Sequence, residues 1–288
     1  MRFGLNVSTM GDCADPRALA ELARDAEQAG WDGFLVWDAI AIAMNDPDQS
    51  AVVDPWIVLA AAAMLTERII LGPIITPLSR RRPWKVARET VTLDHLSNGR
   101  VVLPVGLGAL SDGGFGKVGD VTDRKARAQM LNESLAILDG LWSGEPFCFT
   151  GEHYQLQEMT FRPTPVQSPR IPVWVVAAWP SKASMSRAIR CDGAMPIMRN
   201  ENGEFTRLPS PAELREITSH VANERDSTAP FDIILEGSTP GDDPDKAHAI
   251  VKPFAEAGAT WWLEAVYDEP GGFEGMRKRI HQGPPKIG

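Results

Sequence analysis

Residues 69–108 read IILGPIITPLSRRRPWKVARETVTLDHLSNGRVVLPVGLG: an apolar run, a helical segment and a second apolar run. The first run is short and rich in β-branched residues, so it is predicted to be a strand rather than a buried helix. A helix is predicted from Pro83, where a missing N–H costs nothing, to Asn98-Gly99, which suits a left-handed C-cap. Val101 to Val105 is the next predicted strand. Continuous apolar strands are typical of a parallel sheet buried on both faces, so the stretch predicts a βαβ unit.

The same alternation of apolar strands and amphipathic helices continues along the rest of the chain. Six further strands are predicted, at Arg2–Ser8, Gly33–Trp37, Pro172–Val176, Gly193–Ile197, Phe231–Leu235 and Ala259–Ala265. Together with the two strands above they make eight, which favours a closed (β/α)8 TIM barrel over an open α/β sheet. Thr150-Gly151-Glu152 is a turn between two aromatic-bearing segments, so a hairpin insertion is predicted over Phe147 to Leu156. No Pro/Gly/Ser-rich linker divides the chain, and we expect a single α/β domain over residues 1–288.

The composition argues against several classes of protein. A formal net charge of −9 disfavours general binding to the phosphates of nucleic acid. Cys13, Cys148 and Cys191 are odd in number and widely spaced, which indicates reduced thiols rather than a disulfide framework or a zinc site. The chain begins directly with a predicted strand, and its longest apolar run, Ile57–Leu65, is far too short to span a bilayer. We therefore expect a cytoplasmic protein with no signal peptide and no membrane association.

Several chemically useful groups follow predicted strands, where ligands bind in parallel α/β folds. Asp38 follows the second strand, although it could equally be a helix N-cap or a salt-bridged surface residue. Thr76 and Gly106-Leu107-Gly108 follow the two strands of the opening stretch, and small residues precede Ser181 after the fifth strand. The glycines let backbone N–H groups approach a ring or a phosphate closely. A dinucleotide fingerprint would need a glycine where Ser111 stands, which disfavours a Rossmann site.

As a set, these segments resemble the luciferase-like family of flavin- and deazaflavin-dependent oxidoreductases. The matching pieces are Ile74-Ile75-Thr76-Pro77, Arg82-Pro83, Ala87 to Thr90, Leu93-Asp94 with Leu96-Ser97, Gly99-Arg100 and Val105-Gly106-Leu107-Gly108. Phe149, Gly151 and Tyr154 also follow a family pattern. The resemblance covers nearly the whole chain, thinning after about Pro196, and it implies a TIM barrel that binds FMN or coenzyme F420.

The resemblance implies that the cofactor ring lies against Asp38 and Ala39. Several family members carry a catalytic histidine where this chain has Ala39, and some deazaflavin-dependent sugar-phosphate dehydrogenases carry a catalytic glutamate where it has Ala109. Neither of those acid/base residues transfers to this chain. The catalytic residues are therefore left unassigned.

Behind the ring, family members often hold a non-prolyl cis peptide bond, which would correspond to Pro73–Ile74. Ile74 would then support one face of the ring, and Thr76 would offer its hydroxyl to a ring carbonyl or nitrogen. Gly106, Leu107 and Gly108 would bring their backbone close to the cofactor. The alternative for Pro73–Pro77 is a plain buried strand that stops at its final proline.

The resemblance places the ribityl phosphate of the cofactor beyond the fifth strand, near Ala177 and Ala178. Ser181 begins the helix that follows, and a helix N-terminus is suited to anions. Trp179 either lines the substrate side of the pocket or packs between helices. The three arginines Arg80–Arg82 either attract an anionic cofactor tail or form a solvated helix start.

The expected function is that of a luciferase-like oxidoreductase acting on a small organic substrate. With FMN the resemblance implies monooxygenation, with a separate reductase that supplies the reduced cofactor. A homodimer is expected with either cofactor. With coenzyme F420 it implies hydride transfer to or from carbon, and the motifs favour this deazaflavin slightly. A non-catalytic carrier of the cofactor is the rival hypothesis.

The residues that select the substrate are expected in the predicted loops Ala39–Val53, Ala109–Asp123 and Arg199–Pro209. The absence of Ser-His-Asp and His-Glu-x-x-His motifs argues against a hydrolase or a zincin.

Overall fold

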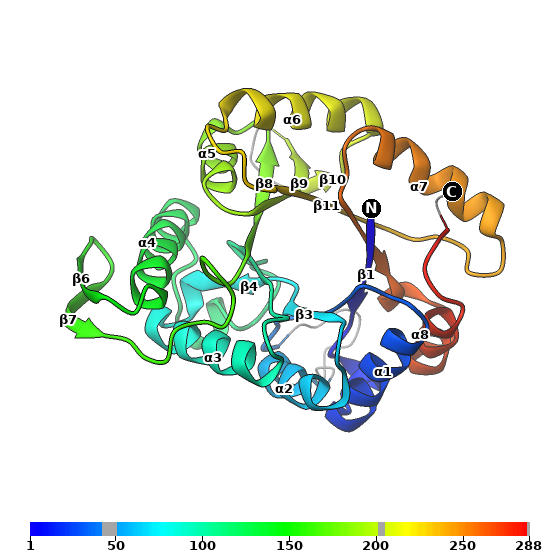
Figure 1. Ribbon diagram of the computed structural model, residues 1–288, viewed down its shortest axis with the longest axis horizontal. Coiled ribbons are helices and arrows are strands. Elements are labelled where there is room, and N and C mark those ends of the chain that lie inside the picture. Colours follow the sequence, from blue (N-terminus) through cyan, green and yellow to red (C-terminus); the bar gives the residue numbers. More distant parts are fainter. Residues whose placement is uncertain (42–50, 201–204, 287–288) are drawn as a thin grey trace.

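The computed structural model describes residues 1–41, 51–200 and 205–286, which form a parallel β-barrel ringed by helices (Figure 1). The predicted TIM-barrel class is therefore confirmed. The predicted loops over residues 39–53 and 199–209 lie partly outside the described residues. Within the described ranges, no helix is both long enough and apolar enough to cross a membrane.

Hydrogen-bonded pairing runs through nine barrel strands in the order β3-β2-β1-β12-β11-β9-β8-β5-β4. Their bounds are β1 Arg2–Val7, β2 Gly33–Val36, β3 Ile70–Pro73, β4 Thr76–Pro77, β5 Leu103–Gly106, β8 Val173–Trp179, β9 Gly193–Arg199, β11 Asp232–Gly237 and β12 Trp261–Ala265. β3 and β4 are two pieces of one predicted strand, so the nine pieces occupy eight barrel positions. A parallel β-bridge joins Leu71 of β3 to Val101, two residues before β5. This bridge connects the two ends of the strand order and closes the barrel.

The helices lie outside the barrel and connect successive strands (Figure 1). Their bounds are α1 Pro16–Gln28, α2 Pro55–Leu65, α3 Pro83–Leu96, α4 Arg124–Trp142, α5 Lys182–Ile189, α6 Pro211–Glu224, α7 Pro244–Glu256 and α8 Gly272–His281. Local sequence explains several of their starts. The carboxylates of Asp15, Asp54 and Asp123 accept N–H groups of the first turns of α1, α2 and α4. Such caps satisfy donors that have no partner inside the helix.

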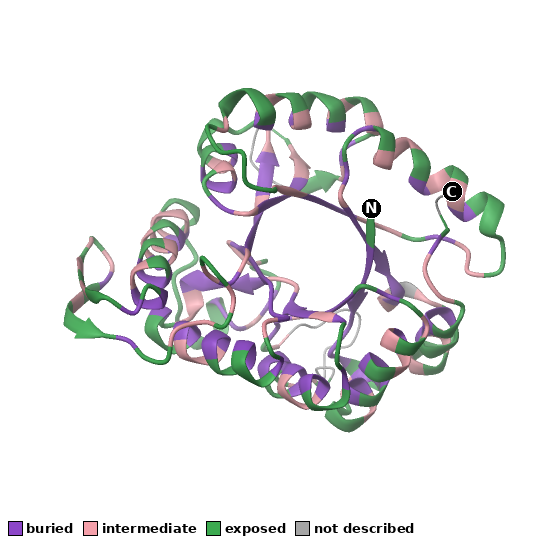
Figure 2. Cartoon of the chain, in the orientation of Figure 1, coloured by how far each residue is buried: buried purple, intermediate pink, exposed green. Residues whose placement is uncertain are grey.

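The apolar core has two parts separated by the barrel wall. The larger part packs the outer faces of the strands against the helices, and it includes Phe34 and Val36 of β2. The smaller part contains Leu35 from the same strand together with Trp174 and Trp261, and all its buried members come from strands or from the residue that leads into β5. Because side chains alternate across a strand, this smaller cluster fills the barrel interior. Figure 2 shows the resulting buried ring of strands, with exposed residues mainly on the outer faces of the helices.

A buried arginine explains part of the Gly99-Arg100 motif. The Arg100 guanidinium donates to the carbonyls of Ala63 and Thr66 near the C-terminus of α2 and to the carbonyl of Ile69 at 2.8 Å. Its Nε donates to the carbonyl of Ser97 just after α3. One side chain therefore satisfies carbonyl groups that have no helical partner at the C-terminal ends of two helices. This role is structural, because Arg100 lies at the opposite end of β3 and β5 from the cavity described below.

The predicted hairpin is confirmed, with β6 Pro146–Thr150 antiparallel to β7 Gln155–Thr160. It projects from the barrel beside α4 (Figure 1). The carboxylate of Glu133 in α4 accepts the backbone N–H groups of Glu152, His153 and Tyr154, which fixes the turn.

Two predicted boundaries were wrong near the ends of β8 and β9. β8 continues to Trp179, because its ladder with β9 extends to the pair Trp179 and Met198. Ala177, Ala178 and Trp179 therefore lie within the strand, not after it. The predicted loop over 199–209 also contains a short strand, β10 Phe205–Arg207, which pairs antiparallel with β9.

Candidate functional site

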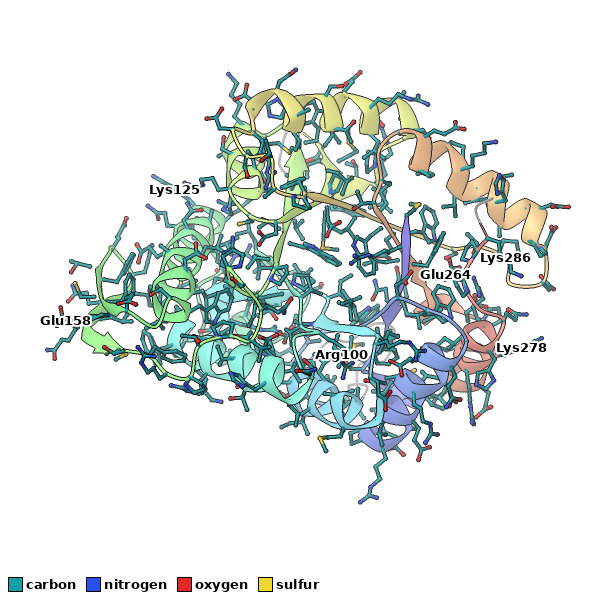
Figure 3. All side chains as sticks on the ribbon, viewed as in Figure 1. Arg100, Lys125, Glu158, Glu264, Lys278 and Lys286 are labelled. Carbon is teal, nitrogen blue, oxygen red and sulfur yellow. The ribbon has the colours of Figure 1, made fainter. Side chains whose placement is uncertain are left out.

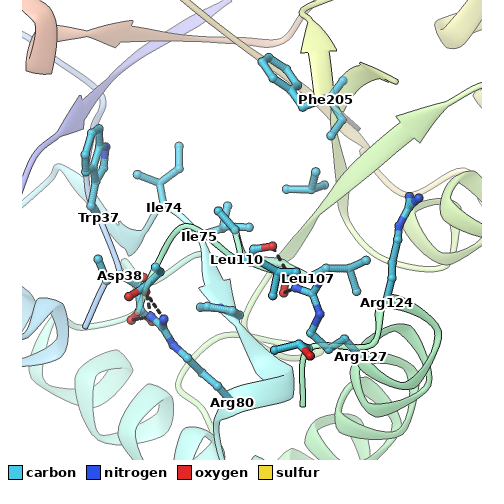
Figure 4. Close-up of a pocket in the computed structure, with 18 of the residues that line it drawn as sticks. Trp37, Asp38, Ile74, Ile75, Arg80, Leu107, Leu110, Arg124, Arg127 and Phe205 are labelled. Atoms are coloured by element: carbon cyan, nitrogen blue, oxygen red, sulfur yellow. Dashed lines mark hydrogen bonds and ion pairs between the residues drawn. The ribbon is translucent and has the colours of Figure 1, made fainter. Parts of the chain in front are cut away.

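A cavity of about 610 Å³ lies at the carboxyl ends of the barrel strands (Figure 4). Ile74, Ile75 and Val176 form its floor, since they line the cavity and also pack on the apolar cluster inside the barrel. Leu107 and Ile197 add apolar surface to the wall. A concave site of this size, largely apolar with a few polar groups, is typical of small-molecule binding.

Gly106 lies beneath this floor, where any side chain would collide with it. A Cβ on Gly106 would stand 2.3 Å from Cδ1 of Ile75 and 3.2 Å from Cγ2 of Val176. Gly108 has φ of +75°, and its Cβ would stand 2.7 Å from the Phe115 ring. The sequence-based explanation for Gly106 was a close approach of ligand to backbone. In the structure, the group that approaches Gly106 closely is the side chain of Ile75.

A non-prolyl cis peptide bond is present at the end of β3, but it joins Ile74 to Ile75. The predicted position, Pro73–Ile74, was therefore wrong by one residue. The N–H of Ile74 still donates to the carbonyl of Val36 at 2.7 Å, so the bond from Pro73 to Ile74 lies within the regular pairing with β2.

Asp38 lines the cavity, but its carboxylate is fully buried in an ion-pair cluster. Oδ1 of Asp38 lies 3.0 Å from Nη2 of Arg80 and 2.6 Å from Nη2 of Arg81. Arg80 also pairs with Asp112, and its Nη2 donates to the backbone carbonyl of Asp38 at 2.6 Å. The cluster ties together the chain segments that follow β2, β4 and β5. Both carboxylates and the buried Arg80 are thus already neutralised within the protein.

Asp112 fixes the loop after β5 to the residues after β2. Its carboxylate accepts the N–H groups of Ala41 and Gly114, each at 2.9 Å. Burial alone would raise the pKa of Asp112, but these two hydrogen bonds and the Arg80 guanidinium outweigh burial and hold the pKa below its ordinary value. Asp112 therefore remains ionised at neutral pH and serves as a structural anion.

A polar network that the sequence analysis did not identify stands behind another wall of the cavity. Trp37, which lines the cavity, donates from Nε1 to Oδ1 of Asn6 at 2.7 Å. Asn6 donates to Glu236 at 2.8 Å, and the Tyr267 hydroxyl donates to the other oxygen of Glu236 at 2.5 Å. The rings of Trp37 and Tyr267 are 4.9 Å apart. Glu236 lies near the carboxyl end of β11, one residue beyond the predicted strand Phe231–Leu235, and the rule that identified Asp38 would also have found it.

The sequence analysis also missed a basic side of the cavity. Arg124 and Arg127, from the first turns of α4, line it together with Arg199 at the end of β9. Figure 4 shows Arg124 and Arg127 on the side of the cavity formed by α4. The sequence shows that Arg124 and Arg127 stand three residues apart at the start of a predicted helix. Nothing in the sequence alone shows that these two side chains face the cavity.

The structure places five of the predicted cofactor-contact residues around the cavity: Asp38, Ala39, Ile74, Leu107 and Gly108. It places the other predicted residues elsewhere. Thr76 is fully buried, and its hydroxyl has no hydrogen-bond partner among the described residues. Gly106 is buried beneath the floor. The roles of all these residues in binding stay predictions.

The segment predicted to hold the cofactor phosphate does not line the cavity. Ser181 is exposed at the start of α5, and its side chain makes no capping hydrogen bond. The Ser184 hydroxyl instead accepts the N–H of Ala178 at 2.9 Å. Trp179 packs edge-on against His220 of α6, with ring centroids 5.3 Å apart. Ala177 is fully buried. Of the two predictions for Trp179, the geometry favours packing between elements.

Comparison with known proteins places this chain among the flavin- and deazaflavin-dependent oxidoreductases. Residues 1–283 match the model of the luciferase-like monooxygenase family. An F420-dependent glucose-6-phosphate dehydrogenase from Beutenbergia cavernae is 30% identical over 256 residues, which cover 88% of this chain and 71% of the relative. The F420-dependent glucose-6-phosphate dehydrogenase from Nakamurella multipartita is 31% identical over 214 residues, which cover 74% of this chain and 60% of the relative. The chain thus spans between 60% and 71% of the length of these curated relatives.

Solved structures confirm the architecture. Monooxygenase RslO1 from Streptomyces bottropensis superposes with a TM-score of 0.79 at 18% identity, covering 98% of this chain and 97% of the other. An F420-dependent secondary alcohol dehydrogenase in complex with an F420-acetone adduct gives a TM-score of 0.77, also at 18% identity and with the same coverage. At such identities the likeness establishes the fold.

Proposed function

This chain belongs to the luciferase-like monooxygenase family, and from that premise we propose that it uses coenzyme F420 to transfer a hydride to or from carbon in a small organic substrate. The broader statement, that it is an oxidoreductase working with a flavin or deazaflavin, follows from the family and its enzyme relatives. The choice of F420 over FMN is supported by the names of the curated relatives at 30% and 31% identity.

The observation that carries the proposal is the shape and chemistry of the cavity. Its floor of Ile74, Ile75 and Val176 offers apolar surface to one face of a fused ring, and its volume of about 610 Å³ falls in the range of small-molecule sites. The arginines on the α4 side offer positive charge to an anionic tail. These residues fit a flavin or deazaflavin.

Bound F420 would supply or accept the hydride, while the protein would supply orientation and a dry pocket. The apolar floor excludes water from the ring face. The Asp38, Arg80 and Asp112 cluster fixes the surrounding loops, so that the cavity walls are held before a ligand arrives. Ala39 and Ala109 carry no acid or base. The carboxylate of Glu236 is connected through Asn6 to the cavity-lining Trp37. We propose that Glu236 positions Trp37 against the substrate side.

Titration of the purified protein with F420 and, separately, with FMN tests the proposal. We expect spectral changes on binding with a lower Kd for F420, and oxidation of reduced F420 in the presence of a carbonyl substrate. Ile75→Glu puts a charge into the apolar floor and should weaken binding at least about 10-fold, or 1.4 kcal/mol. Val166→Glu, at a position 47% exposed, is the matched control. Tighter binding of FMN with oxygen-dependent turnover would replace the F420 assignment by monooxygenation.

The rival hypothesis of a non-catalytic cofactor carrier has no support in the comparisons. Turnover of reduced cofactor with any substrate would exclude it. If FMN is the cofactor, a separate reductase would have to supply its reduced form. A cytoplasmic location is also part of the proposal.

A further inference from the structure

Large apolar side chains at the cavity remain half exposed to water. Leu110, in the loop after β5, is 51% exposed, Phe205 of β10 is 57% exposed, and both line the cavity. On the outer surface of the molecule, charged side chains such as Lys125, Glu158 and Lys278 project away from the barrel (Figure 3). Apolar side chains that stay exposed at the rim of a cavity, on a chain with a formal net charge of −9, indicate a binding site rather than ordinary surface.

These two residues share the cavity with Trp37. Figure 4 shows Trp37 after β2, Leu110 after β5 and Phe205 beyond β9, placed around the same space. Ala39 and Ala109 also line this space, and their side chains are single methyl groups. Segments far apart in the sequence therefore contribute apolar surface to one opening. Apolar and aromatic linings of this kind bury most of the surface of a small ligand.

The polar groups of this lining offer little to a sugar, because most of them are already engaged. Asp38 and Asp112 are both paired with Arg80, and the indole N–H of Trp37 is donated within the protein. The arginines on the α4 side are those that the proposed function assigns to an anionic tail. Among the described residues that line the cavity, Thr122 is the only one with a hydroxyl or amide side chain. Since a buried hydroxyl group without a partner costs free energy, a polyhydroxylated substrate would be bound poorly here.

The backbone that carries the exposed apolar side chains is fixed. Leu110 lies in a turn in which the N–H of Asp112 donates to the carbonyl of Ala109 at 3.1 Å. Phe205 lies in a β-strand, where it pairs with Arg199 of β9. Burying either side chain by a rearrangement of its own segment would break these backbone interactions. Contact with an apolar ligand would remove both side chains from water at little cost in ordering the protein.

We propose that Trp37, Leu110 and Phe205 form a subsite for the apolar body of an uncharged substrate, an alkyl chain or a hydrocarbon ring that bears the reacting carbonyl or hydroxyl carbon. The subsite rests on the proposed function and names the substrate class for it. This class differs from glucose 6-phosphate, which the names of the two curated relatives specify for those enzymes.

The test measures the binding of a homologous series of methyl ketones, from 2-pentanone to 2-nonanone, by isothermal titration. The protein is loaded with oxidised F420, so that the ketones bind without being reduced. Each additional CH2 group that leaves water should lower the Kd about fourfold until the subsite is full. Glucose 6-phosphate, titrated in the same way, should bind more weakly than 2-nonanone.

Substitutions at the rim identify the residues that bind the ketones. Leu110→Asn and Phe205→Asn should each weaken the binding of 2-nonanone about 10-fold and that of 2-pentanone less, while the Kd of F420 stays at its wild-type value. Leu110→Met keeps an apolar side chain and should retain most of the affinity. Val118→Asn is the matched control, because Val118 lies in the same loop and is 59% exposed but is not among the described residues that line the cavity.

Kd values that stay level along the ketone series, or rim variants that match Val118→Asn for 2-nonanone, would overturn the subsite. Equal losses of F420 and 2-nonanone would also overturn it, by assigning both rim residues to the cofactor. Tighter binding of glucose 6-phosphate than of 2-nonanone would exclude the apolar class. Failure of the proposed function gives a different pattern, in which neither F420 nor FMN binds to the wild type. The ketone series on the protein without cofactor would then still compare Leu110→Asn with Val118→Asn.

Discussion

At the scale of single residues, the floor of the cavity depends on the missing side chain of Gly106. We predict that Gly106→Ala weakens cofactor binding about 10-fold, or 1.4 kcal/mol, because its Cβ would force Ile75 upward into the space of the ring. Isothermal titration with F420 or FMN measures the change. Gly116→Ala is the control, since a Cβ there meets nothing within 4 Å. Unchanged affinity in a folded Gly106→Ala protein would show that the ring does not rest on Ile75.

At the scale of elements, the ion pair between Arg80 and Asp112 holds the loop after β5 against the end of β4. Asp112→Asn removes one anionic partner of a buried guanidinium, and we expect the free energy of unfolding to fall by about 2 to 4 kcal/mol at pH 7. Urea denaturation provides the measurement. Asp120→Asn, in the same loop but exposed, should change stability by less than about 0.5 kcal/mol.

The same pair predicts a dependence of stability on pH. The pKa of Asp112 is lower in the folded protein than its ordinary value, so its ionisation contributes stability above about pH 4, and this contribution is lost as the pH falls through the folded pKa. The difference in unfolding free energy between the wild type and Asp112→Asn should therefore shrink between pH 7 and pH 3. A difference that stays constant over this range would contradict the assigned role of the charge.

At the scale of the whole molecule, one helix face packs against no other element in the described part of the chain. α2 carries no charged side chain, and Ile57 and Met64 on its outer side are 66% and 67% exposed. A helix that is apolar all round is normally buried, so we expect this face to pack against a second copy of the chain in a homodimer. Met64→Glu should raise the dimer dissociation constant at least about 100-fold in analytical ultracentrifugation. Met159→Glu, on the exposed hairpin, should leave the dimer intact, and a monomeric wild type would contradict the proposal.

We also expect the single domain predicted from the sequence to unfold as one unit. β1 pairs with β12, so the two ends of the chain are neighbours in one sheet, with Arg2 opposite Trp261. Tryptophan fluorescence and far-UV circular dichroism should then report coincident transitions. Two separated transitions would show that part of the barrel folds independently.

The sequence by itself determined the elements, the fold class and the end of the barrel where ligands bind. Helix bounds such as Arg124–Trp142 agree because caps and apolar periodicity act over a few residues and are visible locally. The barrel follows from the repeated strand and helix pattern, and Asp38 and Gly108 were placed at the site because strand ends converge in any parallel barrel. Ile74 was placed there by the resemblance to the family.

Only the tertiary structure decided which side chains meet there and what they do. Asn6 and Glu236 are 230 positions apart in sequence, and no local pattern predicts their hydrogen bond. The direction of Arg127, the neutralisation of Asp38 by Arg80, and the collision that a side chain on Gly106 would make all depend on elements packed from distant parts of the chain. The physical reason is that helical hydrogen bonding, capping and the alternation of side chains along a strand are local, whereas burial, charge pairing and cavity shape arise from long-range packing.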